Sequence, residues 1–244
     1  MFNPEKETPK QEQENQVPFS GELKMADLGT QTAREAIREL ESRPDLLIRK
    51  DDLDRYAEKE QAPEVYKNSE RLFAELRKKY GIAVPSMQFI VGKDERGVET
   101  LFTITQRVEG ENVGDILDAG KKDAEFKNKL EEVYINFARY FEDKYKSGEE
   151  LLWDFHNAQF VYGKLKGDKE NNIYMVDLDP VFGREGDARQ NFTDNLSEMI
   201  RDAETRFGAK LLKAREEFKK MFDAMSPQDR KDFQTAEVWA LLRD

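Results

Sequence analysis

The sequence contains no cysteine and only one histidine among its 244 residues. The absence of cysteine excludes disulfide bonds, thiolate zinc sites and cysteine nucleophiles. No apolar run approaches the roughly 20 residues that a membrane-spanning helix needs, and the first residues lack the apolar core of a signal peptide. We therefore expect a cytoplasmic protein that does not associate with membranes.

The chain also has fewer basic than acidic residues, 40 against 51, which gives a formal net charge of −11. Such a field repels the phosphates of nucleic acid, so nucleic acid is not expected as a partner. Hydrophobic residues make up only 38% of the sequence, but 16 Phe and 8 Tyr supply large groups for a core. The length suits one two-lobed domain or two small ones.

The distribution of residue types divides the chain into a tail and two structured parts. Residues 1–17 are polar and nearly free of core-forming residues, which is typical of a disordered tail. Residues 32–42 fit either a polar connection or a helix, and both remain open. Hydrophobic periodicity predicts strands at 46–48, 87–91, 100–106, 160–165 and 173–176, and helices at 63–80, 113–119, 123–146, around 192–207, up to about 225 and from Ser226 onward.

Two carboxylates flank the predicted hairpin 160–176. Asp154 lies five residues before Gln159 at its start, and Asp177 leads out of its second strand. Phosphoryl transfer needs one carboxylate to orient the acceptor hydroxyl and take its proton, and further oxygen ligands for magnesium on the nucleotide. A hairpin whose ends share one cleft supplies these groups, with Asp154 as the base and Gln159 and Asp177 on the metal.

These segments resemble the aminoglycoside phosphotransferases and related small-molecule kinases. That family has an Asp-x-His-x-x-Asn loop, a hairpin, and then a metal-binding Asp after a strand. Residues 154–159 read Asp-Phe-His-Asn-Ala-Gln, and Asp177 follows the returning strand. Upstream, residues 103–113 resemble the family's hinge and its Gly-Glu-Asn-Leu turn. The resemblance covers roughly residues 28–200.

The resemblance implies an α+β, two-lobed protein-kinase-like fold that uses ATP and Mg²⁺. Its small antiparallel-sheet N-lobe would span 18–108, and its mainly helical C-lobe, with the catalytic-loop hairpin, 109–244. The hinge backbone that pairs with adenine would fall on Gln106 and Val108.

The resemblance also implies a lysine–glutamate clamp on the nucleotide phosphates. The lysine of the third strand falls on Lys50 or Arg49, and alternation along the strand leaves both open. Helix 63–80 resembles the helix that supplies the glutamate. Glu64 and Glu75 are expected to project away from its apolar face, whereas Glu70 lies at the border and is chosen.

Some positions depart from the family pattern. Gln159 replaces the expected Asn, and the segment around Gly29 has one glycine where several usually let backbone amides approach phosphate.

Two functions follow: a phosphotransferase that moves the γ-phosphate of ATP to a hydroxyl of an unidentified small molecule or protein, and a pseudokinase-like module that binds a nucleotide or protein without turnover. A helical interaction protein with incidental hairpins is a third reading.

Overall fold

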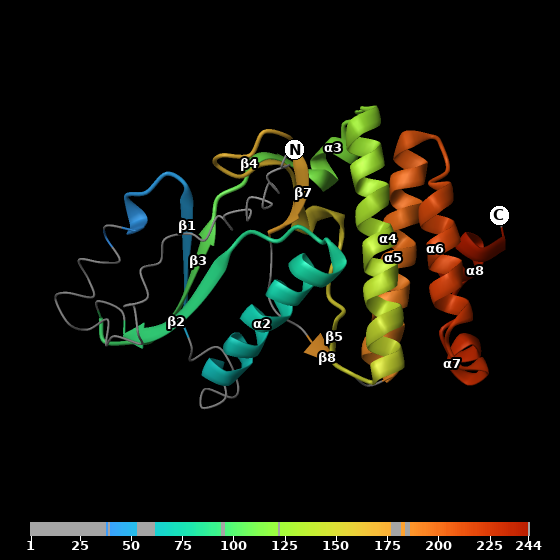
Figure 1. Ribbon diagram of the computed structural model, residues 1–244, viewed down its shortest axis with the longest axis horizontal. Helices are drawn as coiled ribbons and strands as arrows, with labels where there is room; N and C mark the ends of the chain where they lie inside the picture. Colours follow the sequence, from blue (N-terminus) through green and yellow to red (C-terminus); the bar gives the residue numbers. More distant parts are fainter. Residues whose placement is uncertain are drawn as a thin grey trace, which may run out of the picture.

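The computed structural model describes residues 38, 40–52, 62–93, 96–121, 123–176, 182–183 and 186–243. A sheet-containing N-terminal part lies beside a mainly helical C-terminal part (Figure 1). This arrangement confirms the predicted α+β class with small antiparallel sheets and a helical C-terminal region. The predicted tail 1–17 and the segment around Gly29 lie outside the described residues. Every helix that the structure describes is too short or too polar to cross a membrane.

The N-terminal sheet has three antiparallel strands in the order β1-β3-β2. Its strands are β1 (Leu46–Asp52), β2 (Met87–Lys93) and β3 (Glu99–Gln106). All three were predicted, although β1 extends beyond the expected residue 48. The central strand β3 contributes Phe102 and Ile104 to the core, and Ile104 lies opposite Ile48 of β1.

Helix α2 (Ala62–Tyr80) packs beside β2 and confirms the helix predicted at 63–80. Its described buried residues are Leu72, Phe73 and Leu76, the spacing of one apolar face. Gly81 ends the helix with a φ of 68°, a conformation that glycine adopts without steric cost.

A second sheet, in the order β4-β6-β7, contains the predicted hairpin. Strand β4 (Glu109–Asn112) pairs with β6 (Phe160–Lys164), which pairs with β7 (Asn172–Met175). Gly110 lies opposite Gly163, and a Cβ on Gly163 would stand 2.2 Å from the Glu109 carbonyl oxygen. The two backbones approach so closely here that only glycine fits. A short pair of β5 (Leu151–Leu152) with β8 (Phe182–Gly183) lies nearby.

The C-terminal part is built mainly from helices. They are α3 (Val113–Asp118), α4 (Ala124–Ser147), α5 (Gly186–Phe207), α6 (Leu212–Asp223), α7 (Pro227–Asp232) and α8 (Ala236–Arg243). The helix start predicted at Ser226 is confirmed, because its side chain accepts the Asp229 N–H. The chain then turns at the buried Phe233 and starts a separate α8, with the Thr235 hydroxyl accepting the Val238 N–H.

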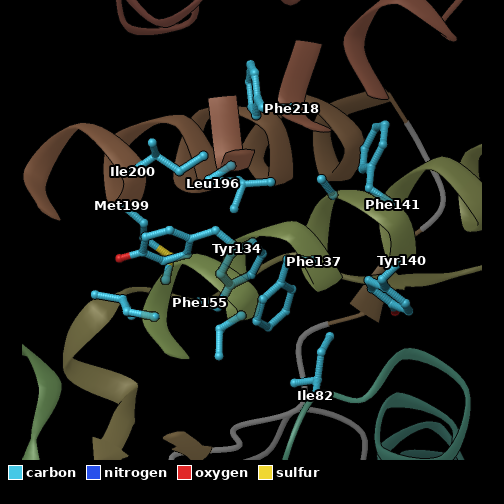
Figure 2. Close-up of a cluster of buried hydrophobic side chains, with 14 of the residues drawn as sticks. Ile82, Tyr134, Phe137, Tyr140, Phe141, Phe155, Leu196, Met199, Ile200 and Phe218 are labelled. Carbon is cyan, nitrogen blue, oxygen red and sulfur yellow. The ribbon is translucent and has the colours of Figure 1, made fainter. Parts of the chain in front are cut away.

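Aromatic side chains fill the space between α4, α5 and the loop before β6 (Figure 2). Phe137 of α4 stacks on Phe155 of that loop, with ring centroids 4.6 Å apart. Phe192 of α5 meets Phe155 at 4.7 Å. The apolar stripe predicted on α4 is therefore core, and it also anchors the loop that carries the candidate chemistry.

Candidate functional site

Asp154 lies in the loop between β5 and β6, between two anchored residues. The Trp153 carbonyl accepts a hydrogen bond of 2.8 Å from the Asn195 side chain, and Phe155 is buried in the aromatic core. Asp154 itself remains partly exposed. The anchoring on both sides fixes the backbone around Asp154 while the residue stays accessible, as a base that acts on a bound hydroxyl requires.

Asn157 holds the middle of this loop in place. Its Oδ1 accepts a hydrogen bond of 2.8 Å from the Tyr134 hydroxyl, and its Nδ2 donates to Asp202 at 3.2 Å. Burial raises the pKa of Tyr134 well above its usual value, and the charge of Asp202 adds to this effect. The hydroxyl therefore stays protonated and donates. Sequence reasoning gave Asn157 no role, although a polar residue amid Phe155 and Phe160 was a signal.

Gln159, predicted as a magnesium ligand, caps the loop. The side chain is buried, and its Oε1 accepts the His156 N–H at 3.0 Å, while the Gln159 N–H donates to the His156 carbonyl at 2.9 Å. An amide oxygen has two lone pairs, so this bond leaves one for a metal ion. The exposed His156 contributes backbone to this turn.

The base of the hairpin brings Val176, the residue before Asp177, beside Gln159. The Val176 N–H donates to the Gln159 carbonyl at 2.9 Å, directly beyond the pairing of Phe160 with Met175. Asp177 itself lies outside the described residues. An amide and a carboxylate oxygen are hard donors of the kind that Mg²⁺ binds, so the chemistry of this donor pair fits that ion.

The pairing register of the first sheet places Lys50 and Arg49 on opposite faces of that sheet. Lys50 lies opposite the buried Phe102, whereas Arg49 lies opposite Thr103 on the other face. The Lys50 ammonium pairs with Glu41 at 2.5 Å, and the lysine side chain is 49% exposed. The side chain of Glu70 lies outside the described residues, so the proposed clamp between Lys50 and Glu70 stays a prediction.

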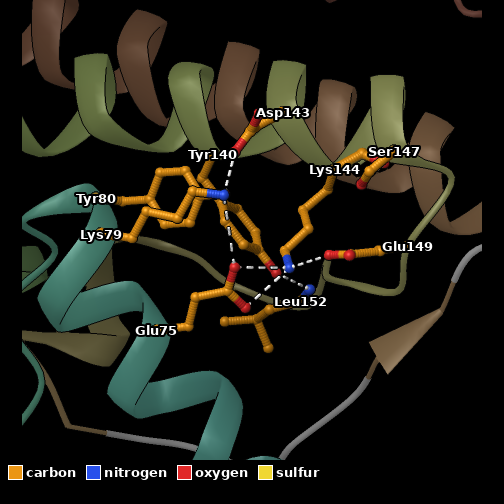
Figure 3. Close-up of polar contacts among 9 residues, drawn as sticks. All are labelled: Glu75, Lys79, Tyr80, Tyr140, Asp143, Lys144, Ser147, Glu149 and Leu152. Carbon is orange, nitrogen blue, oxygen red and sulfur yellow. Dashed lines mark hydrogen bonds and ion pairs between the residues drawn. The ribbon is translucent and has the colours of Figure 1, made fainter.

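Glu75 differs from the sequence expectation, because it points to α4 and not into solvent (Figure 3). Its carboxylate accepts from the Lys144 ammonium at 2.8 Å, and Glu149 accepts from the same ammonium at 2.6 Å. The Lys144 side chain is only 3% exposed. Five residues further along α2, Tyr80 donates to Asp143 at 2.6 Å. Charged and polar groups thus fasten α2 to α4.

The predicted hinge is fastened to the loop after α2. The Gln106 N–H donates to the Ser86 carbonyl at 3.0 Å, and the Gln106 Oε1 accepts the Ser86 N–H at 3.2 Å. Val108 is half-buried and directly precedes β4. Asn112, at the end of β4, donates from its side chain to the Ala158 carbonyl at 2.7 Å. The turn that follows the hinge is therefore bonded directly to the loop that carries Asp154.

Comparison with known proteins adds structural likenesses but no sequence relatives. No protein-family model matches the chain, and no curated protein matches it. A divergent Toxoplasma kinase that lacks the glycine-rich loop is similar over 84% of this chain and 77% of its own, with 15% identity and a TM-score of 0.47.

The bifunctional kinase-methyltransferase WbdD is similar over 81% of this chain, with 14% identity and a TM-score of 0.40. This chain spans 44% of WbdD. The fold is kinase-like in its order of elements: a three-stranded sheet with one helix, a connecting segment, a helical part and a loop leading into a hairpin. Likenesses this distant carry no argument about activity.

Proposed function

We propose that the chain binds Mg-ATP between the β1-β3-β2 sheet and the β6–β7 hairpin, and transfers the γ-phosphate to an acceptor hydroxyl. The hydrogen bond from Val176 to Gln159 supports this proposal, because it brings the residue before Asp177 against Gln159, at the end of the loop that carries Asp154. These are the positions that phosphoryl transfer requires of a base and a metal-binding pair.

In this proposal Asp154 orients the acceptor hydroxyl and takes its proton. Gln159 and Asp177 would hold Mg²⁺, which when bound supplies charge neutralisation to the phosphates. Lys50 projects from the same sheet face as Phe102 and would contact the phosphates, with Glu70 as its partner. The backbone of Gln106 and Val108 would pair with adenine.

Thermal melts with and without Mg-ATP test the binding step. Binding stabilises the native state by about 2.7 kcal/mol at a hundredfold excess over Kd. Asp154→Asn should retain this shift and lose turnover, measured as release of labelled γ-phosphate and as self-phosphorylation by mass spectrometry. Asp223→Asn, at the distant C-terminal end of α6, is the matched control and should lose neither. A melt unchanged at millimolar Mg-ATP would count against nucleotide binding altogether.

Lys50 and Arg49 allow a charge-matched test of the phosphate contact, because they lie on opposite faces of β1. Lys50→Met should weaken Mg-ATP binding by about tenfold, equivalent to about 1.4 kcal/mol, whereas Arg49→Met should leave the Kd within about twofold of wild type. Calorimetric titration measures both. If Arg49→Met weakened Mg-ATP binding more than Lys50→Met, the phosphate contact would be assigned to Arg49.

The second candidate is a nucleotide- or protein-binding module without turnover. Two contacts favour it: the Gln159 side chain is already bonded to His156, and the Lys50 ammonium is already paired with Glu41. Wild-type protein that shows the Mg-ATP shift but no phosphate release above Asp154→Asn would establish this candidate over the first.

A further inference from the structure

A cavity of about 490 Å³ lies at the turn end of the β6–β7 hairpin. Its walls come from the end of α2, the loop 83–86, Gln106 at the end of β3, the hairpin turn 165–168 and Tyr174 of β7. Gln159 and Val176 lie at the opposite end of the same hairpin. Four or five residues of strand at about 3.3 Å each separate the two ends by roughly 15 Å. None of the residues 153–160 lines the cavity, so the cavity is distinct from the Asp154 loop.

The charges on the cavity wall are mostly positive, although the whole chain carries −11. Arg77 and Lys78 come from α2, and Lys166 comes from the hairpin turn. Asp168 is the one carboxylate among the described residues that line the cavity. Its Oδ2 accepts hydrogen bonds from the Leu165 N–H and from a tyrosine hydroxyl, so it belongs to the structure of the turn. Arg77 and Lys166 against this one carboxylate leave a locally positive wall, and Asp45, with which Lys166 also interacts electrostatically, is itself paired with Arg43.

Hydrogen-bond acceptors on this wall are largely occupied, whereas donors remain. The Gln106 Oε1 accepts from the Ser86 N–H, and the Val84 carbonyl accepts from Arg77 Nη1 at 3.4 Å. Arg77 Nη1 also donates to the Ser86 hydroxyl at 3.0 Å. The rest of the Arg77 guanidinium and the Lys166 ammonium make no hydrogen bond within the described residues. A wall that offers donors and positive charge favours a ligand rich in acceptors.

We propose that this cavity binds a small oxyanion with at least two negative charges, carried as phosphate or carboxylate groups. Its volume falls within the range of about 300–1,000 Å³ typical of small-molecule sites. Arg77 and Lys166 approach from two different elements, so a ligand with two charged groups can engage both. The planar guanidinium suits either group, because it can donate two parallel hydrogen bonds.

Heteronuclear NMR titration of the full chain tests the site. Pyrophosphate and citrate are added separately, in metal-free buffer of constant ionic strength, and the tighter of the two identifies the preferred group. Either should shift the amide signals of Val84, Ser86 and Lys166 in a saturable way, without shifting that of Asp154. Raising the salt concentration should weaken the binding.

Lys166→Gln should raise the Kd at least fivefold. Lys169→Gln is the matched control, because it removes the same charge from the same turn but lies outside the cavity wall, and it should change the Kd less than twofold. Equal binding by the two variants, or no saturable shift with either anion, would overturn the proposal. Binding of a hexaglutamate peptide, with no binding of either small anion, would also overturn the proposal. The cavity would then bind an acidic protein segment.

Discussion

The hydrogen bond between Tyr134 and Asn157 can be tested by removing a single oxygen atom. Tyr134→Phe keeps the ring in the core but leaves the Asn157 Oδ1 without the donor that it has at 2.8 Å. Both side chains are buried, so water cannot readily replace the hydroxyl. An unsatisfied buried acceptor costs about 1–3 kcal/mol. With about 2 kcal/mol and a chain of this length, Tm should fall by about 4–8 °C.

Urea denaturation and calorimetry measure the change in the free energy of unfolding. Tyr162→Phe is the matched control: Tyr162 is half-buried against Phe126, and its hydroxyl has no hydrogen-bond partner among the described residues. This control should stay within about 0.5 kcal/mol of wild type. Hydrogen exchange at residues 155–158 should accelerate in Tyr134→Phe alone, because the bond fixes the centre of that loop.

Equal stability of the two Phe variants would refute this reasoning. It would mean that the bond from Tyr134 adds nothing beyond the packing of Phe155 and that the loop is held by its aromatic contacts. A loss confined to stability, with unchanged exchange in the loop, would instead place the effect of Tyr134 in the helical core.

Three further changes test other parts of the fold. Gly163→Ala would place a Cβ 2.2 Å from the Glu109 carbonyl oxygen, so urea titration should show a loss of about 1–3 kcal/mol. Lys144→Met removes the ammonium that two glutamates share and should cost about 2 kcal/mol in the same assay, less than the 3–5 kcal/mol of fully buried pairs. Burial raises the pKa of Glu204, but the Arg215 guanidinium and the Leu211 N–H together more than offset this and hold it below its usual 4.5. Glu204→Gln should therefore lose about 2 kcal/mol near pH 7, and the difference from wild type should vanish as pH falls through the lowered pKa.

Local sequence signals predicted the elements that carry their own pattern. The stripe of Phe126, Leu130, Val133 and Phe137 specifies α4, because its spacing places all four on one helical face. The start of α7 at Ser226 followed from the cap and the proline after it. These signals act within a few residues, so one sequence is enough to read them.

Contacts between residues far apart in the sequence could not be predicted from such local signals. Glu75 meets Lys144 across 69 residues of sequence, and helical periodicity alone assigned Glu75 to solvent. One signal did exist: Lys144 occupies the next position of the apolar α4 stripe after Tyr140 and Phe141, where a lysine must find a partner. The partner could not be named, because periodicity describes one helix and not its neighbour.

For the candidate site, the sequence indicated which residue types lie around the hairpin, but it did not indicate the hydrogen bonds that hold the loop. The order of Asp154, Gln159 and Asp177 around a hairpin located the loop, and the structure adds the bond from Val176 that closes its base. The part played by Asn157 depends on Tyr134 in another helix, so the local motif could not indicate it.

Helix α4 fixes the position of Asp154 relative to the sheet that carries Lys50. Tyr134 of α4 holds the loop of Asp154, and Lys144 of the same helix holds Glu75 of α2, which packs beside β2. Ten residues of helix separate Tyr134 from Lys144, a rigid spacing of roughly 15 Å. Because both contacts involve buried side chains of one helix, the sheet cannot shift far from the loop without breaking one of them. The position of the sheet relative to the Asp154 loop is therefore set by contacts within the described core.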